Sequence, residues 1–192
     1  MISIRRARPA DAPAIGEIHA QVWRSSYAGI LPEAYLAALS PTRLAGFYQR
    51  AILDRREAHA VFVAVAGGAE APSNGPVAGS GVVGFASGGR ARRPGIAEGE
   101  VETLYLLEDW RERGAGRRLM RAMGAHLRVV GCRSAMLWVL RDNPTRWFYS
   151  HLGGREAARE GIRVGGRAVE QSAYVWDPIE ALLAATAPAQ ER

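Results

Sequence analysis

The chain has 192 residues, the length of one ordinary domain, and apolar residues make up 48% of it. No apolar run reaches the roughly 20 residues that a membrane-spanning helix needs, and the first residues lack the apolar core of a signal peptide. The single cysteine, Cys132, cannot pair within the chain, and no Cys/His cluster suggests a metal site. We therefore expect a cytoplasmic protein without membrane spans, internal disulfides or a bound metal.

The formal charge is +6, and all 25 basic residues are arginine. An arginine-only bias is typical of a GC-rich genome, so part of the basicity is compositional. The remaining positive charge favours anionic partners, with nucleic acid and a polyphosphate cofactor as the two candidates. The segment Arg90-Ala91-Arg92-Arg93 could contact nucleic-acid phosphates, but no aromatic-interleaved basic strand and no recognition-helix pattern accompanies it.

The first part of the chain predicts one short strand followed by helices. Apolar and polar residues alternate over residues 2–4, as in a strand, and then recur at helical spacing. Ser40-Pro41 is typical of a helix cap followed by a first-turn proline. The expected elements are a strand at 2–4, a helix from Pro9 to about Trp23, a short helix after Pro32 and a helix from Pro41 to about Leu53.

From residue 59 onward, β-branched runs and glycine-rich turns replace most of the helical pattern. The expected strands lie at 59–65, 77–87, 101–107, 135–140, 157–164 and 168–176, the loops at 67–76 and 88–98, and the helices at 116–130 and 144–152. The first two of these strands are expected to pair as an antiparallel hairpin, and Gly165-Gly166 predicts a two-residue turn between the last two. The residues after Pro178 are expected to add a helix.

No internal repeat and no long linker interrupts this order of elements. Strands and helices alternate irregularly, which is typical of an α+β fold. The sequence therefore predicts one domain over residues 1–177 and a C-terminal tail over residues 178–192.

A glycine-rich segment joins the strand at 101–107 to the helix that follows it. Its motif is Arg-x-x-Gly-x-Gly, formed by Arg111, Gly114 and Gly116. The first N–H groups of a helix have no partner within the helix, and the helix dipole adds partial positive charge there. Glycines let a pyrophosphate approach the backbone closely. The segment therefore predicts a pyrophosphate cradle, and one or two of its neighbouring arginines are expected to touch phosphate.

A second motif lies downstream, where Asn143, Tyr149 and Gly153 form an Asn-x5-Tyr-x3-Gly pattern. With the two motifs in this order and at this separation, the chain resembles the GNAT superfamily of N-acetyltransferases over about residues 1–177. The stretch Trp23–Pro32 is similar to one in a large group of small bacterial GNAT proteins, most of which have no assigned acceptor.

The resemblance implies a mixed, mostly antiparallel central sheet flanked by helices, with a V-shaped opening between the fourth and fifth strands. It implies acetyl-CoA as the co-substrate, with the pantetheine arm on the fourth strand and the pyrophosphate on the cradle. The implied cofactor-binding residues are Leu104, Leu106, Arg111, Arg113, Gly114, Ala115, Gly116, Arg117 and Asn143. Asn143 could instead cap the end of a strand. Many relatives are homodimers, so the chain could form one too.

Two proton transfers decide which side chains the implied reaction needs. An alkyl amine has a reference pKa of about 10.4 and a thiol of about 8.5. At pH 7, deprotonating the amine costs roughly 4.6 kcal/mol, whereas releasing the bare thiolate costs only about 2 kcal/mol. A general base is therefore expected to matter more than a general acid.

The base candidates are Glu100 and Glu102, with a solvent-facing strand charge as the alternative for each. They are two residues apart and share one face of a regular strand, so Thr103 and Tyr105 are expected to face the other way. Tyr149 is the general-acid candidate that the resemblance implies, with a packed core aromatic as the alternative.

The acceptor site is less defined by the sequence. The resemblance implies a pocket between the first two helices, walled by Trp23, Tyr27 and Leu31, although Trp23 could equally be a core residue. A small-molecule amine is the first expectation for the acceptor. A peptide or protein amine, a cofactor-binding regulator without turnover and a nucleic-acid binder are the alternatives. His19 is expected to pack within its helix layer.

Overall fold

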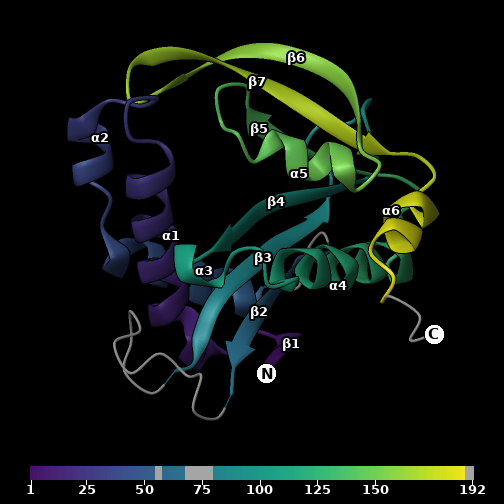
Figure 1. Cartoon of the computed structure of the whole chain (residues 1–192), viewed down its shortest axis with the longest axis horizontal. Helices are drawn as coiled ribbons and strands as arrows, with labels where there is room; N and C mark the ends of the chain where they lie inside the picture. The colour runs from purple at the N-terminus through teal and green to yellow at the C-terminus, as the bar shows by residue number, and fades with distance from the viewer. Residues whose placement is uncertain (55–57, 68–79, 189–192) are drawn as a thin grey trace.

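The computed structural model describes residues 1–54, 58–67 and 80–188, and its strands form one sheet (Figure 1). The strands are β1 (Ile2–Arg6), β2 (Ala60–Ala66), β3 (Val82–Arg90), β4 (Gly99–Leu106), β5 (Ala135–Leu140), β6 (Arg155–Val164) and β7 (Arg167–Trp176). Their order in the sheet is β1-β2-β3-β4-β5-β7-β6. Every neighbouring pair is antiparallel except β4 and β5, which are parallel. This mixed, mostly antiparallel sheet confirms the predicted fold class.

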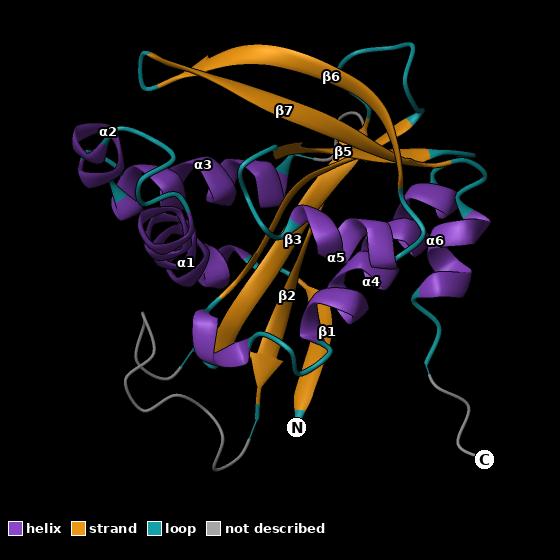
Figure 2. Cartoon of the chain, turned by 45° about the horizontal axis from the view of Figure 1, so that its top comes forward, coloured by secondary structure: helices purple, strands orange, loops and turns teal. Residues whose placement is uncertain are grey.

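Helices cover both faces of the sheet (Figure 2). They are α1 (Ala12–Ser26), α2 (Glu33–Ala37), α3 (Pro41–Leu53), α4 (Ala115–Val129), α5 (Arg146–His151) and α6 (Glu180–Ala185). α1 and α3 pack on one face, whereas α4 packs on the other, where α5 and α6 also lie. Among the described residues, no helix is long and apolar enough to span a bilayer.

The helix starts follow from local chemistry. α3 begins at Pro41 as predicted, and the Ser40 hydroxyl accepts a hydrogen bond of 3.3 Å from the backbone N–H of Arg43. α1 begins at Ala12, later than predicted, because a 3₁₀ turn over Pro9–Asp11 precedes it. Capping residues and prolines therefore place helix boundaries to within a few residues.

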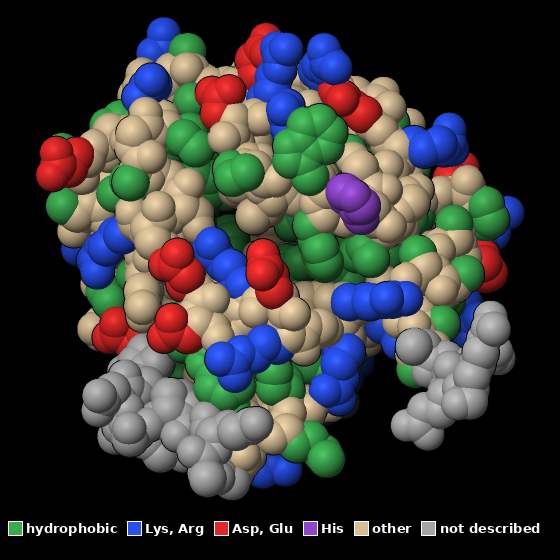
Figure 3. All heavy atoms as spheres, viewed as in Figure 1, with side chains coloured by type: hydrophobic (Ala, Val, Ile, Leu, Met, Phe, Trp, Pro, Cys, Tyr) green, Lys and Arg blue, Asp and Glu red, His purple; other side chains and the backbone are tan. Residues whose placement is uncertain are grey.

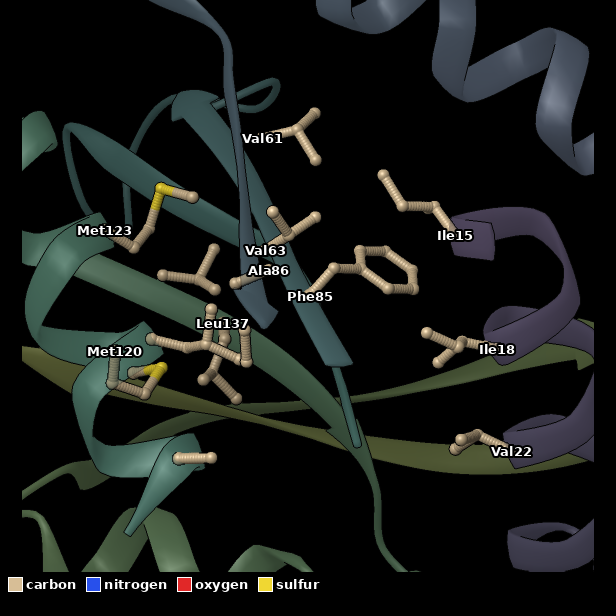
Figure 4. Packing of buried hydrophobic residues seen from close by; sticks show 14 of the residues in the cluster. Ile15, Ile18, Val22, Val61, Val63, Phe85, Ala86, Met120, Met123 and Leu137 are labelled. Carbon is tan, nitrogen blue, oxygen red and sulfur yellow. The ribbon is translucent and has the colours of Figure 1, made fainter. Parts of the chain in front are cut away.

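The core fills both sides of the sheet centre (Figure 4). Ile15 and Ile18 of α1 lie beside Phe85 on one face, whereas Met120 and Met123 of α4 lie on the other, and all five are fully buried. Full burial of such side chains contributes roughly 1.5–3 kcal/mol each. The centre of the sheet is therefore a packed support for the residues at its open end.

The segment after Pro178 forms α6, as predicted, and packs on α4. Ile179 and Leu182 have no exposed surface and belong to the main core. These residues therefore contribute to the packing of the fold.

β3 differs from the prediction at both ends. It begins at Val82, and it continues through residues 88–90, which were predicted as loop. Gly88 lets β3 approach β4 closely, because a Cβ at this position would meet the carbonyl oxygen of Glu100. Residues 68–79, which include the start of the predicted strand and most of the predicted loop before it, lie outside the described residues.

α5 is shorter than the predicted helix at 144–152. Asn143 ends the preceding strand in a turn, and its side-chain oxygen accepts a hydrogen bond of 2.9 Å from the backbone N–H of Thr145. Helical structure therefore begins only at Arg146.

The predicted V-shaped opening between the fourth and fifth strands is confirmed. β4 and β5 pair only at Gly99 with Ala135 and at Glu100 with Met136. Beyond these two pairs the strands part, so the backbone of β4 after Glu100 has a free edge toward β5. This parting makes the cleft described below.

β4 contains a β-bulge at the base of the opening. Ser87 of β3 pairs with Thr103 and the next residue, Gly88, pairs with Val101, so Glu102 is an extra residue without a paired position. The bulge changes which residues share a face. Because Thr103 bonds to Ser87 at 2.7 Å on the side of α1 and α3, the prediction that it faces away from Glu100 is wrong.

Tyr105 is displaced by the bulge in the same way. Its ring lies 5.0 Å from that of His19 of α1 and 5.5 Å from that of Phe85. Gly99, by contrast, faces Leu127 of α4. The extra residue shifts the alternation of side chains by one position. Tyr105 therefore lies on the α1 face of the sheet, opposite to the face predicted from regular alternation.

The last two strands form the predicted hairpin around Gly165-Gly166, which arches over the open end of the sheet (Figure 1). Its tip lies against α2, where Gly165 meets the ring of Tyr35. The Arg167 guanidinium also donates a hydrogen bond of 3.3 Å to the carbonyl of Gly29, in the turn after α1. The hairpin thus closes this end of the opening against the α1–α2 turn.

Candidate active site

A cleft of about 430 Å³ opens where β4 and β5 part. On the outside, hydrophobic side chains gather in a hollow between α4 and α5, with basic side chains near its rim (Figure 3). The cleft is lined by Val22, Ser26, Tyr27, residues 101–106, Arg111, Glu112, Gly114, Gly116, Arg117, Leu137, Trp138, Val139, Asn143, Thr145, Phe148 and Tyr149. Both predicted motifs therefore meet at one cleft.

The start of α4 forms a backbone cradle on one wall of this cleft. Gly114 caps the helix in the left-handed conformation, with φ of 76°, and Glu112 is also left-handed, with φ of 59°. Left-handed residues on both sides of Arg113 give an alternating backbone, and such alternation turns successive N–H groups inward to form an anion-binding nest. The geometry therefore suits a phosphate group better than an ordinary helix start would.

The arginines near the cradle divide into two groups. Arg111 and Arg117 line the cleft. Arg113 stacks over Trp110 with its guanidinium carbon 4.9 Å from the ring centre, and Arg118 donates to the carbonyl of Ile2. Two of the four arginines are thus placed to reach a ligand in the cleft through their side chains.

Ala115 and the two leucines contribute in different ways. Leu104 and Leu106 line the cleft from β4, as predicted, beside the free edge of that strand. Ala115 is 1% exposed and does not line the cleft, so only its backbone belongs to the first turn of α4.

Asn143 both caps the end of β5 and lines the cleft. Its side-chain oxygen accepts hydrogen bonds from the backbone N–H of Thr145 at 2.9 Å and from the Thr145 hydroxyl at 2.8 Å. Its side chain also hydrogen-bonds to the Tyr27 hydroxyl. The amide is therefore held between α1 and α5, which fixes the width of the cleft at this point.

Tyr149 comes from α5 and faces the cleft. It is 7% exposed, with rings of Phe148 and Tyr174 at 5.4 and 6.2 Å. Burial raises the pKa of the Tyr149 phenol well above its usual value. The hydroxyl therefore keeps its proton throughout the neutral and moderately alkaline range.

Glu100 is a buried carboxylate whose oxygens are both occupied. Arg92 donates to it through its backbone N–H and Nε, each at 3.2 Å to Oε2, and through Nη2 at 2.5 Å to Oε1. Glu100 does not line the cleft. Its structural role is to anchor the loop between β3 and β4.

Glu102, the bulge residue, lines the cleft. One carboxylate oxygen lies 3.5 Å from Nε2 of His59 and the other 3.9 Å from Nε of Arg92. Burial raises the pKa of Glu102, but the His59 and Arg92 contacts outweigh burial, so the net pKa lies below its usual value. Glu102 is therefore ionised at neutral pH and faces the cleft.

The three residues predicted to wall the acceptor pocket lie together in the structure, but only Tyr27 lines the cleft. Tyr27 lines the cleft, whereas Leu31 is buried in a second apolar cluster, against which Trp23 packs. The members of that cluster are Tyr27, Leu31, Leu36 and Leu140. Trp23 and Leu31 thus pack beneath the α1–α2 turn and do not line the cleft.

His19 is packed, as expected, and carries a hydrogen bond. Its Nδ1 lies 2.9 Å from the Tyr48 hydroxyl. Burial lowers the pKa of His19 to about 4. The ring is therefore neutral at physiological pH.

Sequence reasoning missed two residues that shape the site, His59 and Arg92. The loop arginines were considered as nucleic-acid contacts, but Arg92 binds Glu100, Arg93 binds Glu160 and Arg90 donates to the carbonyl of Val130. Their high local charge was the available signal. Within the described residues, no group of three His, Cys, Asp or Glu side chains could hold a metal ion.

Comparison with known proteins shows which proteins the chain is similar to. A family model for FR47-like proteins matches residues 82–164, which contain the cradle, Glu102 and Tyr149. The chain is also similar to the Bacillus subtilis protein named uncharacterized N-acetyltransferase YuaI. The two are 29% identical over 184 residues, which cover 95% of this chain and 96% of YuaI.

Solved structures share the fold. Arabidopsis thaliana NAA60, in complex with a bisubstrate analogue, aligns with a TM-score of 0.66 and 18% identity over 92% of this chain and 97% of its own. The Salmonella typhimurium protein yncA, solved with acetyl-CoA, aligns with a TM-score of 0.62 and 19% identity over 92% of this chain and 93% of its own. With a cradle and a parted β4–β5 pair at the motifs that carry the resemblance, the chain is similar in sequence and in fold to N-acetyltransferases of the GNAT family.

Proposed function

We propose that this protein transfers an acetyl group from acetyl-CoA to the amine of a small molecule, by direct attack in a ternary complex. The observation that carries the proposal is the convergence of three features on one cleft. These are an anion cradle at the start of α4, a free backbone edge on β4, and a facing carboxylate and phenol, Glu102 and Tyr149.

The cleft fits acetyl-CoA in charge and in shape. The left-handed residues Glu112 and Gly114 suit a pyrophosphate, and Arg111 and Arg117 add positive charge beside it. The free edge of β4, with Leu104 and Leu106 beside it, suits an extended amide-containing arm. When bound, acetyl-CoA supplies the activated acyl group as a thioester.

Glu102 is the better base of the two predicted carboxylates. Both oxygens of Glu100 are occupied by Arg92, whereas Glu102 lines the cleft. An amine needs roughly 4.6 kcal/mol to lose its proton at pH 7, so a carboxylate that takes the proton during attack, directly or through water, removes the largest barrier. Glu102 therefore accepts the proton, and Glu100 holds the loop.

Tyr149 is suited to the second proton transfer. Its phenol lines the cleft and keeps its proton because burial raises its pKa. A donor that stays protonated at neutral pH can give a proton to a departing thiolate sulfur. We therefore assign Tyr149 the general-acid role.

A small acceptor is supported by the closed acceptor side. The tip of the β6–β7 hairpin rests on α2, and Arg167 is bonded to the carbonyl of Gly29. The walls that Tyr27 and Phe148 contribute to the cleft are aromatic. Such an enclosed, aromatic site accommodates a small amine more readily than an extended chain.

The first test is thermal unfolding with and without acetyl-CoA, because a ligand that binds only the folded state raises the melting temperature. We expect a clear rise for the wild type. Gly116→Leu should abolish the rise, since a Cβ there lies 3.3 Å from side chains of Leu106 and Phe148 on the cleft wall. Gly161→Leu is the matched control, because no atom lies within 4 Å of a Cβ at that position.

The second test is thiol release from acetyl-CoA with a panel of amines, which reports transfer. Release that depends on an amine would support the enzymatic proposal. A cofactor-dependent rise in melting temperature with no release on any amine would favour a regulator instead. No rise at millimolar acetyl-CoA would remove the basis of the proposal.

A further inference from the structure

The loop between β3 and β4 contains an arginine, Arg92, that contacts both Glu100 and Glu102. Arg92 makes three hydrogen bonds to Glu100, and its Nε also lies 3.9 Å from Glu102. Its side chain is 65% exposed, whereas that of Glu100 is 5% exposed. A solvent-reaching cation therefore caps a buried carboxylate directly beside the proposed base.

The neighbouring arginine holds this loop in place. Arg93 donates two hydrogen bonds to Glu160 of β6, at 3.1 and 2.7 Å, and lies over the ring of Trp138 of β5 at 5.4 Å. Arg92 and Arg93 thus tie the loop to β4, β5 and β6. Arg92 is positioned by this attachment.

These contacts determine the net charge of the acidic residues next to a bound acceptor. Glu100 and Glu102 each carry one negative charge, and Arg92 compensates one of them. His59 contributes charge only when it is protonated. With His59 neutral, one uncompensated negative charge faces the cleft, and it resides on Glu102.

The surfaces around that charge are aromatic and apolar. Tyr27, Tyr105, Phe148 and Tyr149 line the same cleft. Glu102 and Glu112 are the acidic residues that line the cleft, and Glu112 lies at the cofactor cradle. A second ammonium group on the acceptor would therefore be buried without a carboxylate partner, which is unfavourable. The walls favour an apolar body on the amine.

We propose that Arg92 is a specificity-determining residue, which sets the acceptor site to a single negative charge and thereby selects amines with one positive charge on an apolar body over diamines. The inference rests on the proposed function and names the substrate class of that same site. Arg92 acts through Glu100 and the local charge and takes no part in proton transfer.

The test compares two acceptors that differ only in a second ammonium group, pentylamine and 1,5-diaminopentane. The readout is the ratio of kcat/KM for the diamine to that for the monoamine, measured at pH 9. The wild type should prefer the monoamine. Arg92→Gln leaves two uncompensated carboxylates and should raise the ratio about tenfold.

Three companion variants make the test decisive. Glu100→Gln leaves Arg92 opposite Glu102 alone and should lower the ratio, which keeps the test informative if Arg92→Gln does not fold. The double variant Arg92→Gln/Glu100→Gln restores one negative charge and should return the ratio to near the wild-type value. Arg141→Gln is the matched control, since it also removes an arginine from a carboxylate, that of Glu170, but neither residue lines the cleft, so the ratio should stay unchanged.

Each outcome decides the proposal. A ratio that rises in Arg92→Gln, falls in Glu100→Gln and recovers in the double variant supports charge setting by Arg92. A ratio unchanged in both single variants, or changed equally by Arg141→Gln, overturns it. If the wild type acetylates neither these nor any other amines, the proposed function itself fails, so the two failures are distinguishable.

Discussion

Nη2 of Arg111 donates a hydrogen bond of 2.9 Å to the hydroxyl of Ser26, the last residue of α1. Both residues line the cleft, Arg111 beside the backbone cradle at the start of α4 and Ser26 at the end of the first helix. The bond therefore spans the cleft and links its two walls.

Arg111→Ala should weaken acetyl-CoA binding about tenfold, because it removes a charge next to the pyrophosphate cradle. Ser26→Ala keeps that charge and should change the dissociation constant by less than about threefold, since it removes one hydrogen bond of modest net value. Isothermal titration measures both. Equal effects of the two substitutions would show that the bond, and not the charge, matters.

Gly114→Ala should lower the free energy of unfolding by about 1–2 kcal/mol, because residues with a Cβ resist the left-handed conformation that Gly114 adopts. No atom lies within 4 Å of the added Cβ, so backbone strain is the whole effect. Urea denaturation gives the value. Gly161→Ala, with a φ outside the left-handed region and open space around it, is the control and should cause no loss.

Tyr149→Phe should lower kcat about tenfold or more, because it removes the hydroxyl that we assign to protonate the leaving thiolate. Its effect on the melting temperature should be small, since the phenyl ring still fills the buried space. Single-turnover kinetics isolates the chemical step. An unchanged chemical rate would reject the acid role.

His59→Gln should move the acid limb of the kcat/KM profile to higher pH. His59 helps to lower the pKa of Glu102, so without it the pKa of Glu102 rises and the base is protonated at a higher pH. The profile is measured between pH 4 and pH 8 on protein shown to be folded at each pH. His126→Gln is the control, since His126 hydrogen-bonds to the carbonyl of Ala58 and contacts no carboxylate in the site. A uniform, pH-independent loss in His59→Gln would indicate a packing role instead.

His19 should make the protein acid-sensitive between pH 6.5 and pH 4. Burial lowers the pKa of His19 to about 4, so in this window the unfolded chain binds a proton that the folded chain does not, and stability falls as pH falls. The loss is on the order of 3 kcal/mol over the window. His19→Gln should flatten the pH dependence of the unfolding free energy, and an equally steep dependence in the variant would assign the loss to other groups.

Local signals in the sequence predict much of the fold. Ser40-Pro41 marks the start of α3 correctly because capping is a contact between neighbours, and Gly165-Gly166 marks the hairpin turn because backbone conformation there demands glycine. Where structure depends on adjacent residues, sequence patterns are sufficient.

The bulge at Glu102 could not be predicted in this way. The extra residue exists because Ser87 and Gly88 of β3 pair with Thr103 and Val101. Register is a property of two strands, so the assignment of Tyr105 to the opposite face failed. The hydrogen bonds between Arg92 and Glu100 could not be predicted either, because they join residues eight positions apart and no local sequence pattern indicates them.

The parting of β4 and β5 also bears on self-association. Unpaired strand edges usually lie at the margins of a sheet, where they can pair with another chain and promote aggregation. Here the free edge of β4 after Glu100 lies in the middle of the sheet, between its own neighbours and beneath the β6–β7 hairpin. The protein can therefore offer a backbone edge to an extended ligand while withholding that edge from strand exchange with a second copy.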